Sequence, residues 1–124
     1  MRLLALLLCL AATTASAAET KVIKDISYKD DVISQTPYEQ ERCKLDLTVP
    51  VGAKGFATCV YFYGGGLKKG SKDLASEYCD EIRQSFAQAG VAVVTPDYRL
   101  SPKVKYPAYV DDAAAAFAWT VKHI

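Results

Sequence analysis

A run of three glycines is the feature of this 124-residue sequence whose residue types could do chemistry. The apolar segment 60–63 leads directly into Gly64, Gly65 and Gly66. Ordering three successive glycines costs conformational entropy, so they are best explained where side chains would obstruct a group that must approach the main chain closely. The pattern predicts a bare backbone loop that binds a substrate oxygen. A turn chosen only for its dihedral angles is the simpler alternative.

Three chemistries use a glycine-rich loop between a strand and a helix, and their spacing differs. Dinucleotide binding needs GxGxxG, but Lys69 stands where the third glycine is expected. A phosphate loop needs its lysine directly after the last glycine, but Gly70 is followed by Ser71 and then Lys72. The third chemistry is an oxyanion hole, in which backbone N–H groups stabilise the negative oxygen of a tetrahedral intermediate. The spacing favours this third chemistry.

Two strands are expected ahead of the loop. Residues 22–29 suggest an edge strand, and residues 43–50 alternate between apolar and polar types, which predicts a half-buried strand. A polar bend containing Pro37 separates them. The shared faces would be formed by Val22, Lys24, Ile26 and Tyr28 in the first strand, and by Cys43, Leu45, Leu47 and Val49 in the second.

A strand-helix-strand unit should carry the loop. Residues 56–63 are almost continuously apolar, as in strands covered on both faces. Residues 73–89 have the apolar spacing of an amphipathic helix that Ser71 or Asp73 could cap and Gly90 could end. A second apolar run at 91–95 predicts a parallel strand with a right-handed crossover. The helical stripe would be Leu74, Tyr78, Ile82, Phe86 and Ala89.

A second helix is expected to open at Pro107, where a missing N–H does no harm. Its apolar stripe would be Val110, Ala113, Ala114, Phe117, Val121 and Ile124. Alternating strands and helices predict an α/β sheet of about four strands with helices on both faces and the glycine loop at the carboxyl end of a strand. With no strand after the last helix, we expect an incomplete domain.

Two motifs resemble those of α/β-hydrolase esterases and lipases. Residues 61–67, YFYGGGL, are similar to the HGGG-type motif in the loop after the third strand. A second group of residues resembles the downstream signature of the same enzymes, often written YRLAPE, FPA and D. It consists of DYRLSP at 97–102, YPA at 106–108 and DDA at 111–113. The resemblance extends from about residue 23 to residue 124 and points to hormone-sensitive-lipase-like and feruloyl-esterase-like secreted enzymes. It implies the N-terminal part of an α/β-hydrolase sheet, with two leading strands and then strand-helix-strand-helix.

The resemblance also implies roles for residues of the loop. Gly65 and Gly66 would provide the oxyanion hole through their backbone N–H groups, and Gly64 would form the turn. Tyr63 stands where the family usually has histidine, and we expect its hydroxyl to support the loop. The family's chemistry needs no cofactor and no metal, and its substrate would be a small-molecule or carbohydrate-linked ester.

Other polar residues have structural interpretations. Arg99 could pair with Asp111 or Asp112 and tie the strand exit to the second helix, although solvated charges are an equal alternative. His123 precedes any nucleophile elbow, so we interpret it as a surface histidine.

The catalytic serine of such an enzyme sits in a GxSxG elbow on the following strand. No serine here has that setting, including Ser71, Ser76, Ser85 and Ser101. We therefore expect residues 18–124 to be the N-terminal part of a secreted serine carboxylesterase, lacking the elbow and the later strands and inactive alone. A non-catalytic, esterase-like binding protein with the same partial fold is the alternative.

The first 17 residues have the pattern of a signal peptide. Met1 and Arg2 precede an apolar stretch, residues 3–12, that is too short to span a bilayer, and residues 15–17, ASA, form a cleavage site. A lipoprotein anchored at Cys9 is disfavoured because Leu8 precedes it. We expect a secreted or periplasmic protein with no membrane span after cleavage.

Cleavage would leave equal numbers of basic and acidic residues, so no nucleic-acid partner is expected. It would also leave Cys43, Cys59 and Cys79, which have no CxxC spacing and too few partners for a zinc site. We interpret them as small core residues, with one disulfide as the alternative.

Overall fold

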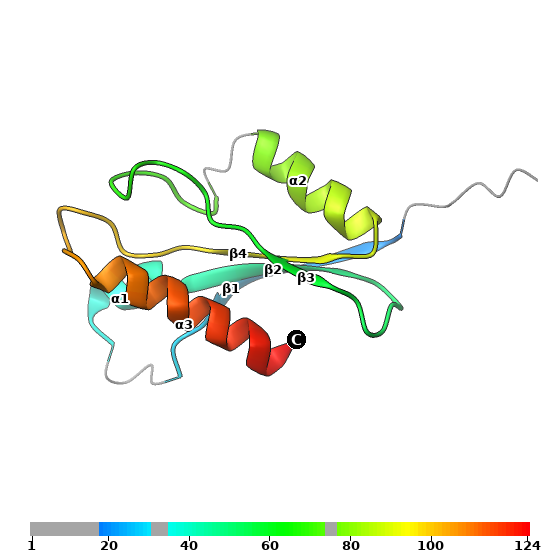
Figure 1. Ribbon diagram of the computed structural model, residues 1–124, viewed down its shortest axis with the longest axis horizontal. Helices are drawn as coiled ribbons and strands as arrows, with labels where there is room; N and C mark the ends of the chain where they lie inside the picture. The colour runs from blue at the N-terminus through cyan, green and yellow to red at the C-terminus, as the bar shows by residue number, and fades with distance from the viewer. Residues whose placement is uncertain (1–17, 31–34, 74–76) are drawn as a thin grey trace, which may run out of the picture.

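A four-stranded sheet lies between two helices. The computed structural model describes residues 18–30, 35–73 and 77–124, so the predicted signal peptide falls outside the described residues. Figure 1 views the sheet nearly edge-on, with α2 on one side and α3 on the other. The elements are β1 (Thr20–Ser27), α1 (Pro37–Arg42), β2 (Lys44–Pro50), β3 (Thr58–Val60), α2 (Glu77–Gln88), β4 (Ala92–Pro96) and α3 (Ala108–His123).

The sheet has the order β1-β2-β4-β3. β2 pairs antiparallel with both β1 and β4, whereas β3 and β4 are parallel. The predicted strand-helix-strand unit and the edge position of β1 are thus confirmed. β3 is shorter than predicted and, within the described residues, pairs with β4 on one side alone. Its three residues are partly exposed, so the prediction of a strand covered on both faces is wrong.

A β-bulge interrupts β1. Ile23 lies opposite Leu47 and Ile26 lies opposite Leu45, with a register shift between the two pairs. Asp25, inside the shift, has a φ of 58°. The extra residue places Ile23 and Ile26 on the same face. The prediction that every second residue of this strand shares one face is therefore wrong.

β2 is buried on both faces. Leu45 and Leu47 contribute to the hydrophobic core on the α3 side. Asp46 and Thr48, on the opposite face, are only 1% and 4% exposed. Asp46 tolerates burial because the ammonium of Lys72 lies 3.0 Å from its Oδ1. The prediction of a half-buried strand is wrong for this reason. The core cluster is Tyr28, Cys43, Leu45, Leu47, Val94 and Ala116.

α1 was not predicted from the sequence. Thr36 caps it: its Oγ1 accepts a hydrogen bond from the N–H of Glu39 at 3.3 Å, and Glu39 Oε2 accepts one from the N–H of Thr36 at 3.0 Å. This reciprocal capping box, with Pro37 in the first turn, is readable from the sequence as TPYE. The helix ends at Arg42, a residue that reaches the glycine loop.

α2 ends as predicted. Gly90 has a φ of 82°, and the N–H of Val91 donates to Phe86 O at 2.9 Å, which closes the helix. The predicted cap residues Ser71 and Asp73 are described, but α2 is described only from Glu77, so the cap stays a prediction, and Leu74 lies outside the described residues. The predicted stripe is wrong at Phe86, which is 43% exposed, because the small and fully buried Ala87 occupies the sheet-facing position.

The predicted apolar stripe of α3 faces away from the sheet. Phe117 and Val121 are 57% and 71% exposed, whereas Asp112, Ala116 and Thr120 are buried. The polar residues on the buried side have partners: Thr120 Oγ1 donates to Ala116 O at 2.9 Å, and Asp112 is held by Arg99. The side of this helix that meets the sheet combines the paired polar residues with small or aromatic apolar residues, since Ala116 belongs to the core and Ala115 and Trp119 pack against it. In the described ranges no helix is long and apolar enough to cross a membrane.

Candidate functional site

The glycine loop, defined here as residues 63–70, begins beyond the carboxyl end of β3. Gly65, Gly66 and Leu67 have φ values of 142°, 62° and 61°. A Cβ at Gly65 would lie 2.0 Å from the carbonyl oxygen of Lys69, so the position requires glycine. Gly64 has no such requirement, since a Cβ there would meet no atom within 4 Å.

Among the described residues, most backbone N–H groups of the loop find no acceptor, and those of Gly65 and Gly66 are among them. The loop is nevertheless fixed by other backbone contacts: Lys68 N donates to Gly65 O at 3.2 Å, and Ser101 N donates to Leu67 O at 2.8 Å. The second contact joins the loop to the chain that leaves β4.

Tyr63 points inward at the start of the loop. Its side chain lies against the ring of Tyr98, with the ring centres 5.0 Å apart and the planes tilted by 14°. Tyr98 Oη donates to Tyr63 O at 3.0 Å. Burial, together with the nearby carboxylate of Asp97, raises the pKa of Tyr63 well above its usual value, so its phenol stays neutral.

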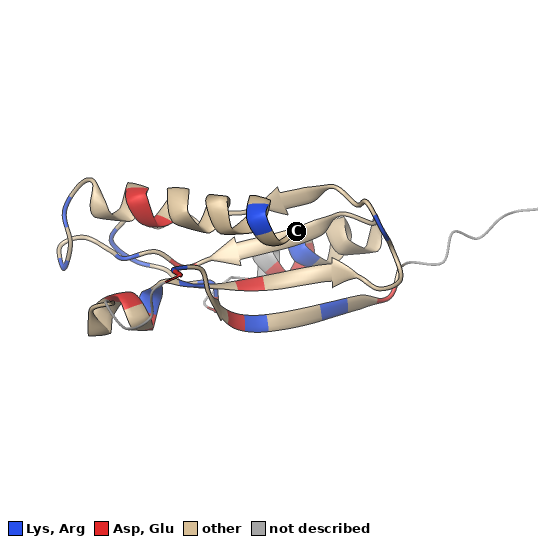
Figure 2. Cartoon of the chain, turned by 90° about the horizontal axis from the view of Figure 1, so that it is seen from below, with Lys and Arg blue, Asp and Glu red and all other residues tan. Residues whose placement is uncertain are grey.

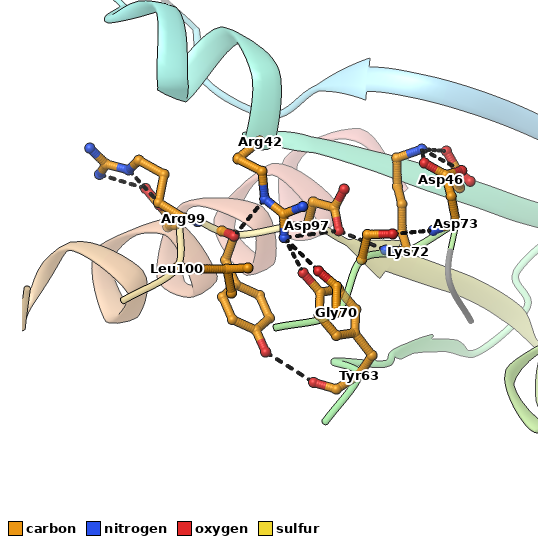
Figure 3. A network of polar contacts seen from close by, with 12 residues as sticks. Arg42, Asp46, Tyr63, Gly70, Lys72, Asp73, Asp97, Arg99 and Leu100 are labelled. Carbon is orange, nitrogen blue, oxygen red and sulfur yellow. Dashed lines mark hydrogen bonds and ion pairs between the residues drawn. The ribbon is translucent and has the colours of Figure 1, made fainter. Parts of the chain in front are cut away.

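Arg42 connects both ends of the loop to the strand exit (Figure 3). Its Nη2 donates to Tyr63 Oη at 2.6 Å and to Gly70 O at 3.0 Å. Its Nε donates to Tyr98 O at 3.1 Å. Sequence analysis missed Arg42, because it comes from a helix that was not expected.

Two buried charges follow the loop. Asp97 Oδ1 accepts a hydrogen bond from Lys72 N at 2.6 Å, and burial raises the pKa of Asp97. Lys72 Nζ lies 2.8 Å from Asp25 and 3.0 Å from Asp46. Burial alone would lower the pKa of Lys72, but the hydrogen bonds to these two carboxylates raise it. The chain leaving the loop is therefore anchored to β1, β2 and the end of β4.

The predicted pair of Arg99 is confirmed, with Asp112 as its partner. Arg99 Nε and Nη2 each lie 2.8 Å from one oxygen of the Asp112 carboxylate. Lys29 Nζ lies 2.8 Å from Asp112 Oδ1 and 3.0 Å from Glu39 Oε1. Burial alone would raise the pKa of Asp112, but the hydrogen bonds from Arg99 and Lys29 lower it. Asp111 is exposed.

The histidine and the described cysteines are not part of the glycine loop. His123 is exposed, as predicted; its ring stacks on Trp119, and its Nδ1 lies 2.8 Å from Trp119 O. Cys43 and Cys59 are free thiols, and burial raises the pKa of Cys43 to about 11. The side chain of Cys79 lies outside the described residues.

An apolar depression of about 340 Å³ lies beside the glycine loop. Aromatic rings from the loop, from the strand exit and from α3 form most of its wall. The lining residues are Phe62, Tyr63, Leu67, Tyr98, Tyr109, Val110 and Ala113.

In the view of Figure 2, basic and acidic residues are interspersed along the elements instead of gathering on one side.

The fold has the features of the N-terminal region of an α/β-hydrolase esterase. These are the antiparallel pair β1 and β2, the parallel unit of β3, α2 and β4, and the glycine loop after β3. Solved structures agree with this class. Esterase B from Lactobacillus rhamnosis is 23% identical with a TM-score of 0.66, over 87% of this chain and 31% of that one. A bifunctional GH43-CE protein of Bacteroides eggerthii is 26% identical with a TM-score of 0.66, over 82% of this chain and 13% of that one.

The sequence profile of the BD-FAE family matches residues 45–124, and the chain belongs to this family of esterase-type hydrolases. Tuliposide A-converting enzyme 2, a chloroplastic protein of Tulipa gesneriana, is 34% identical over 102 residues, which are 80% of this chain. Esterase LipI of Mycobacterium tuberculosis is 42% identical over 64 residues, 52% of this chain. The chain spans 26% of the first of these relatives and 19% of the second.

Proposed function

We propose that residues 18–124 supply the oxyanion-hole loop of a secreted serine carboxylesterase. In this role the N–H groups of Gly65 and Gly66 stabilise the negative charge that develops on the ester carbonyl oxygen. One observation supports the proposal: the N–H groups of Gly65 and Gly66 have no acceptor among the described residues, in a loop whose first and last residues accept hydrogen bonds from Arg42. Fixed donors of this kind stabilise a transition state without reorganising during the reaction.

The reaction would follow the usual course of acyl transfer. A serine hydroxyl attacks the ester carbonyl and loses its proton to a histidine, the carbonyl oxygen becomes anionic, and the alcohol leaves as the acyl-enzyme forms. Water then releases the acid. The serine must come from outside residues 18–124, because no GxSxG occurs in them, and these residues alone should not turn over an ester.

The substrate class is a small-molecule or carbohydrate-linked ester. The apolar depression beside the loop suits the hydrocarbon part of such a molecule, since binding sites for small ligands are lined mainly by apolar and aromatic side chains. The names of Esterase LipI and Esterase B also support an ester substrate.

Export is part of the proposal and rests on the first 17 residues of the sequence. N-terminal sequencing of the protein recovered from the periplasm or the medium tests it directly. We expect the mature protein to begin at Ala18. A protein that retains Met1 inside the cell would contradict export.

The test of the oxyanion hole removes one N–H and nothing else. Replacing Gly66 by glycolic acid in the full-length gene product converts its amide to an ester and preserves the backbone shape. We expect kcat on a p-nitrophenyl ester to fall about 10²–10³-fold, the usual cost of losing one oxyanion donor.

The matched control is the same replacement at Gly55, an exposed glycine with a φ of 65° in the turn before β3. It should leave kcat unchanged. Equal effects at Gly55 and Gly66, or no effect at Gly66, would refute the proposed role of the loop.

A further inference from the structure

Arg42 makes more contacts with the glycine loop than any sequence motif would suggest. It sits in the last turn of α1, and its side chain is 12% exposed. Two of its three guanidinium nitrogens, Nε and Nη2, donate to oxygens of three residues: Tyr63 at the start of the loop, Gly70 at its end, and Tyr98 at the strand exit. Figure 3 shows dashed lines from the guanidinium of Arg42 to Tyr63 and Gly70.

We propose that Arg42 is a positioning residue for catalysis, which holds the two ends of the glycine loop together so that the N–H groups of Gly65 and Gly66 keep the geometry needed for the oxyanion. This inference rests on the proposed function, because it gives the loop its purpose. Neither the family match nor the motifs in the sequence assign a role to Arg42.

The chemistry of the contacts supports positioning over simple charge pairing. The three close acceptors of Arg42 are a phenol and two backbone carbonyls, all neutral. The carboxylate of Asp97 is farther away, with 3.6 Å between Arg42 Nη2 and Asp97 Oδ1. The guanidinium therefore donates its hydrogen bonds to the loop and the strand exit, whereas the carboxylate of Asp97 neutralises its charge.

The site also explains why arginine is needed. A guanidinium is a rigid planar fork with five donors, whereas a lysine ammonium is a single nitrogen on a flexible stem. In Arg42, Nε donates to Tyr98 O, whereas Nη2 donates to Tyr63 Oη and Gly70 O. A single ammonium nitrogen cannot reach all three acceptors. Gly70 and the ring of Tyr63 are closely packed, since a Cβ at Gly70 would lie 2.7 Å from ring carbons of Tyr63.

The experiment compares Arg42→Lys and Arg42→Met with Arg83→Lys in the full-length gene product. Arg83 is a matched control: it lies in α2 and pairs with Asp80, and its Nη1 is 4.0 Å from the buried Asp46. Two quantities are measured: kcat and KM on a p-nitrophenyl ester, and the rate of tryptic cleavage after Lys68 and Lys69, which are exposed in the loop.

Both Arg42 variants should lower kcat about 10–100-fold with KM within about threefold, since a displacement of about 1 Å can cost that much. Both should also speed cleavage at Lys68 and Lys69. Arg83→Lys should change neither quantity. Thermal unfolding of each variant shows that it is folded; if Arg42→Met fails to fold, Arg42→Lys retains the charge and carries the test.

The remaining outcomes separate this inference from the proposed function. Unchanged cleavage and unchanged kcat in the Arg42 variants, with kcat still lost on glycolic-acid replacement at Gly66, would overturn the role of Arg42 alone. Faster loop cleavage with unchanged kcat would overturn the catalytic role of Arg42, whereas the oxyanion function is decided by the replacement at Gly66. A rise in KM with kcat unchanged would show that the residue serves substrate binding, which also overturns it.

Discussion

Arg99 and Asp112 form a two-point ion pair between the chain leaving β4 and the N-terminal half of α3. Two guanidinium nitrogens lie 2.8 Å from the two carboxylate oxygens, and the N–H of Arg99 adds a third bond at 3.1 Å. Two residues further along, Ser101 N bonds to Leu67 O of the glycine loop at 2.8 Å. The pair thus fixes the segment on which the loop rests.

Removing the charge of Asp112 should be strongly destabilising. Asp112→Asn leaves the guanidinium of Arg99 and the ammonium of Lys29 without their buried anion, and breaking a buried pair from one side typically costs about 3–5 kcal/mol. Urea denaturation of the full-length gene product measures this loss. Asp111→Asn, at the exposed neighbouring position, should stay within about 0.5 kcal/mol of the wild type. Similar losses in both variants would contradict the assignment.

Lys72 should be equally sensitive. Lys72→Met removes the ammonium that lies 3.0 Å from the buried carboxylate of Asp46, and we expect a loss of about 3–5 kcal/mol in the free energy of unfolding. Lys68→Met, at an exposed position of the loop, is the control and should be nearly neutral. The double variant Lys72→Met with Asp46→Asn should lose less than the sum of the two single variants, because the residues share one interaction. Strict additivity would show that the pair contributes nothing.

Glu39 should make stability depend on pH in the acid range. The backbone N–H of Thr36 and the ammonium of Lys29 lower the pKa of Glu39 from 4.5 to about 2. A carboxyl with a lowered folded-state pKa contributes stability that is present above its unfolded pKa and is lost as pH falls. The difference in unfolding free energy between the wild type and Glu39→Gln should therefore be largest above about pH 4.5 and shrink toward pH 2.

Urea titrations at pH 6, 4 and 2.5 check this pH dependence. Glu41→Gln, at an exposed position on the same helix, is the control for removing one carboxylate from this helix. A difference for Glu39→Gln that stays constant or grows as pH falls would show that Glu39 is not stabilised in its charged form.

Local sequence signals predicted the elements that carry the site. The apolar run before Gly64, the stop at Gly90 and the second apolar run are all short-range features, and they fixed the parallel unit and the place of the loop. The capping box that starts at Thr36 was also readable but was overlooked. Elements of this kind follow from neighbours along the chain, so sequence reasoning can reach them.

The buried faces of β2 and α3 and the role of Arg42 could not be predicted from the sequence, because they depend on residues far apart along the chain. The hydrogen-bond acceptors of Arg42 lie 21, 28 and 56 residues further along the chain. Likewise, Asp46 and Asp112 are buried because Lys72 and Arg99, distant in sequence, neutralise them. Apolar periodicity predicts that a charged residue faces solvent. No local pattern indicates the distant residue whose opposite charge stabilises the buried carboxylate.

The glycines of the loop should not be equivalent. Gly65→Ala would force a Cβ to within 2.0 Å of Lys69 O, at a φ of 142° that alanine rarely adopts. We expect loss of most esterase activity and a stability loss of at least about 1–3 kcal/mol, the usual range for a strained backbone position. Gly64→Ala meets no atom within 4 Å and is the matched control, with at most a small effect. Equal effects of the two variants on kcat and on thermal unfolding would contradict the described loop.

The exposed side of α3 should dominate the behaviour of residues 18–124 expressed alone. Phe117 and Val121 are 57% and 71% exposed, and exposed apolar groups of this kind promote association. β3, at the end of the sheet, adds an edge with unpaired backbone groups. We therefore expect this chain to bind the dye ANS and to aggregate as its concentration rises.

A lysine substitution locates the cause of that association. Phe117→Lys should reduce both dye binding and light scattering, because it removes the largest apolar side chain of the exposed stripe. Ala118→Lys adds the same charge at the next exposed position without removing an apolar ring, so it should reduce them much less. If the two variants behave alike, net charge governs the association. If the unsubstituted chain is a monomer with a sharp cooperative melt and no dye binding, then α3 does not present an associating surface.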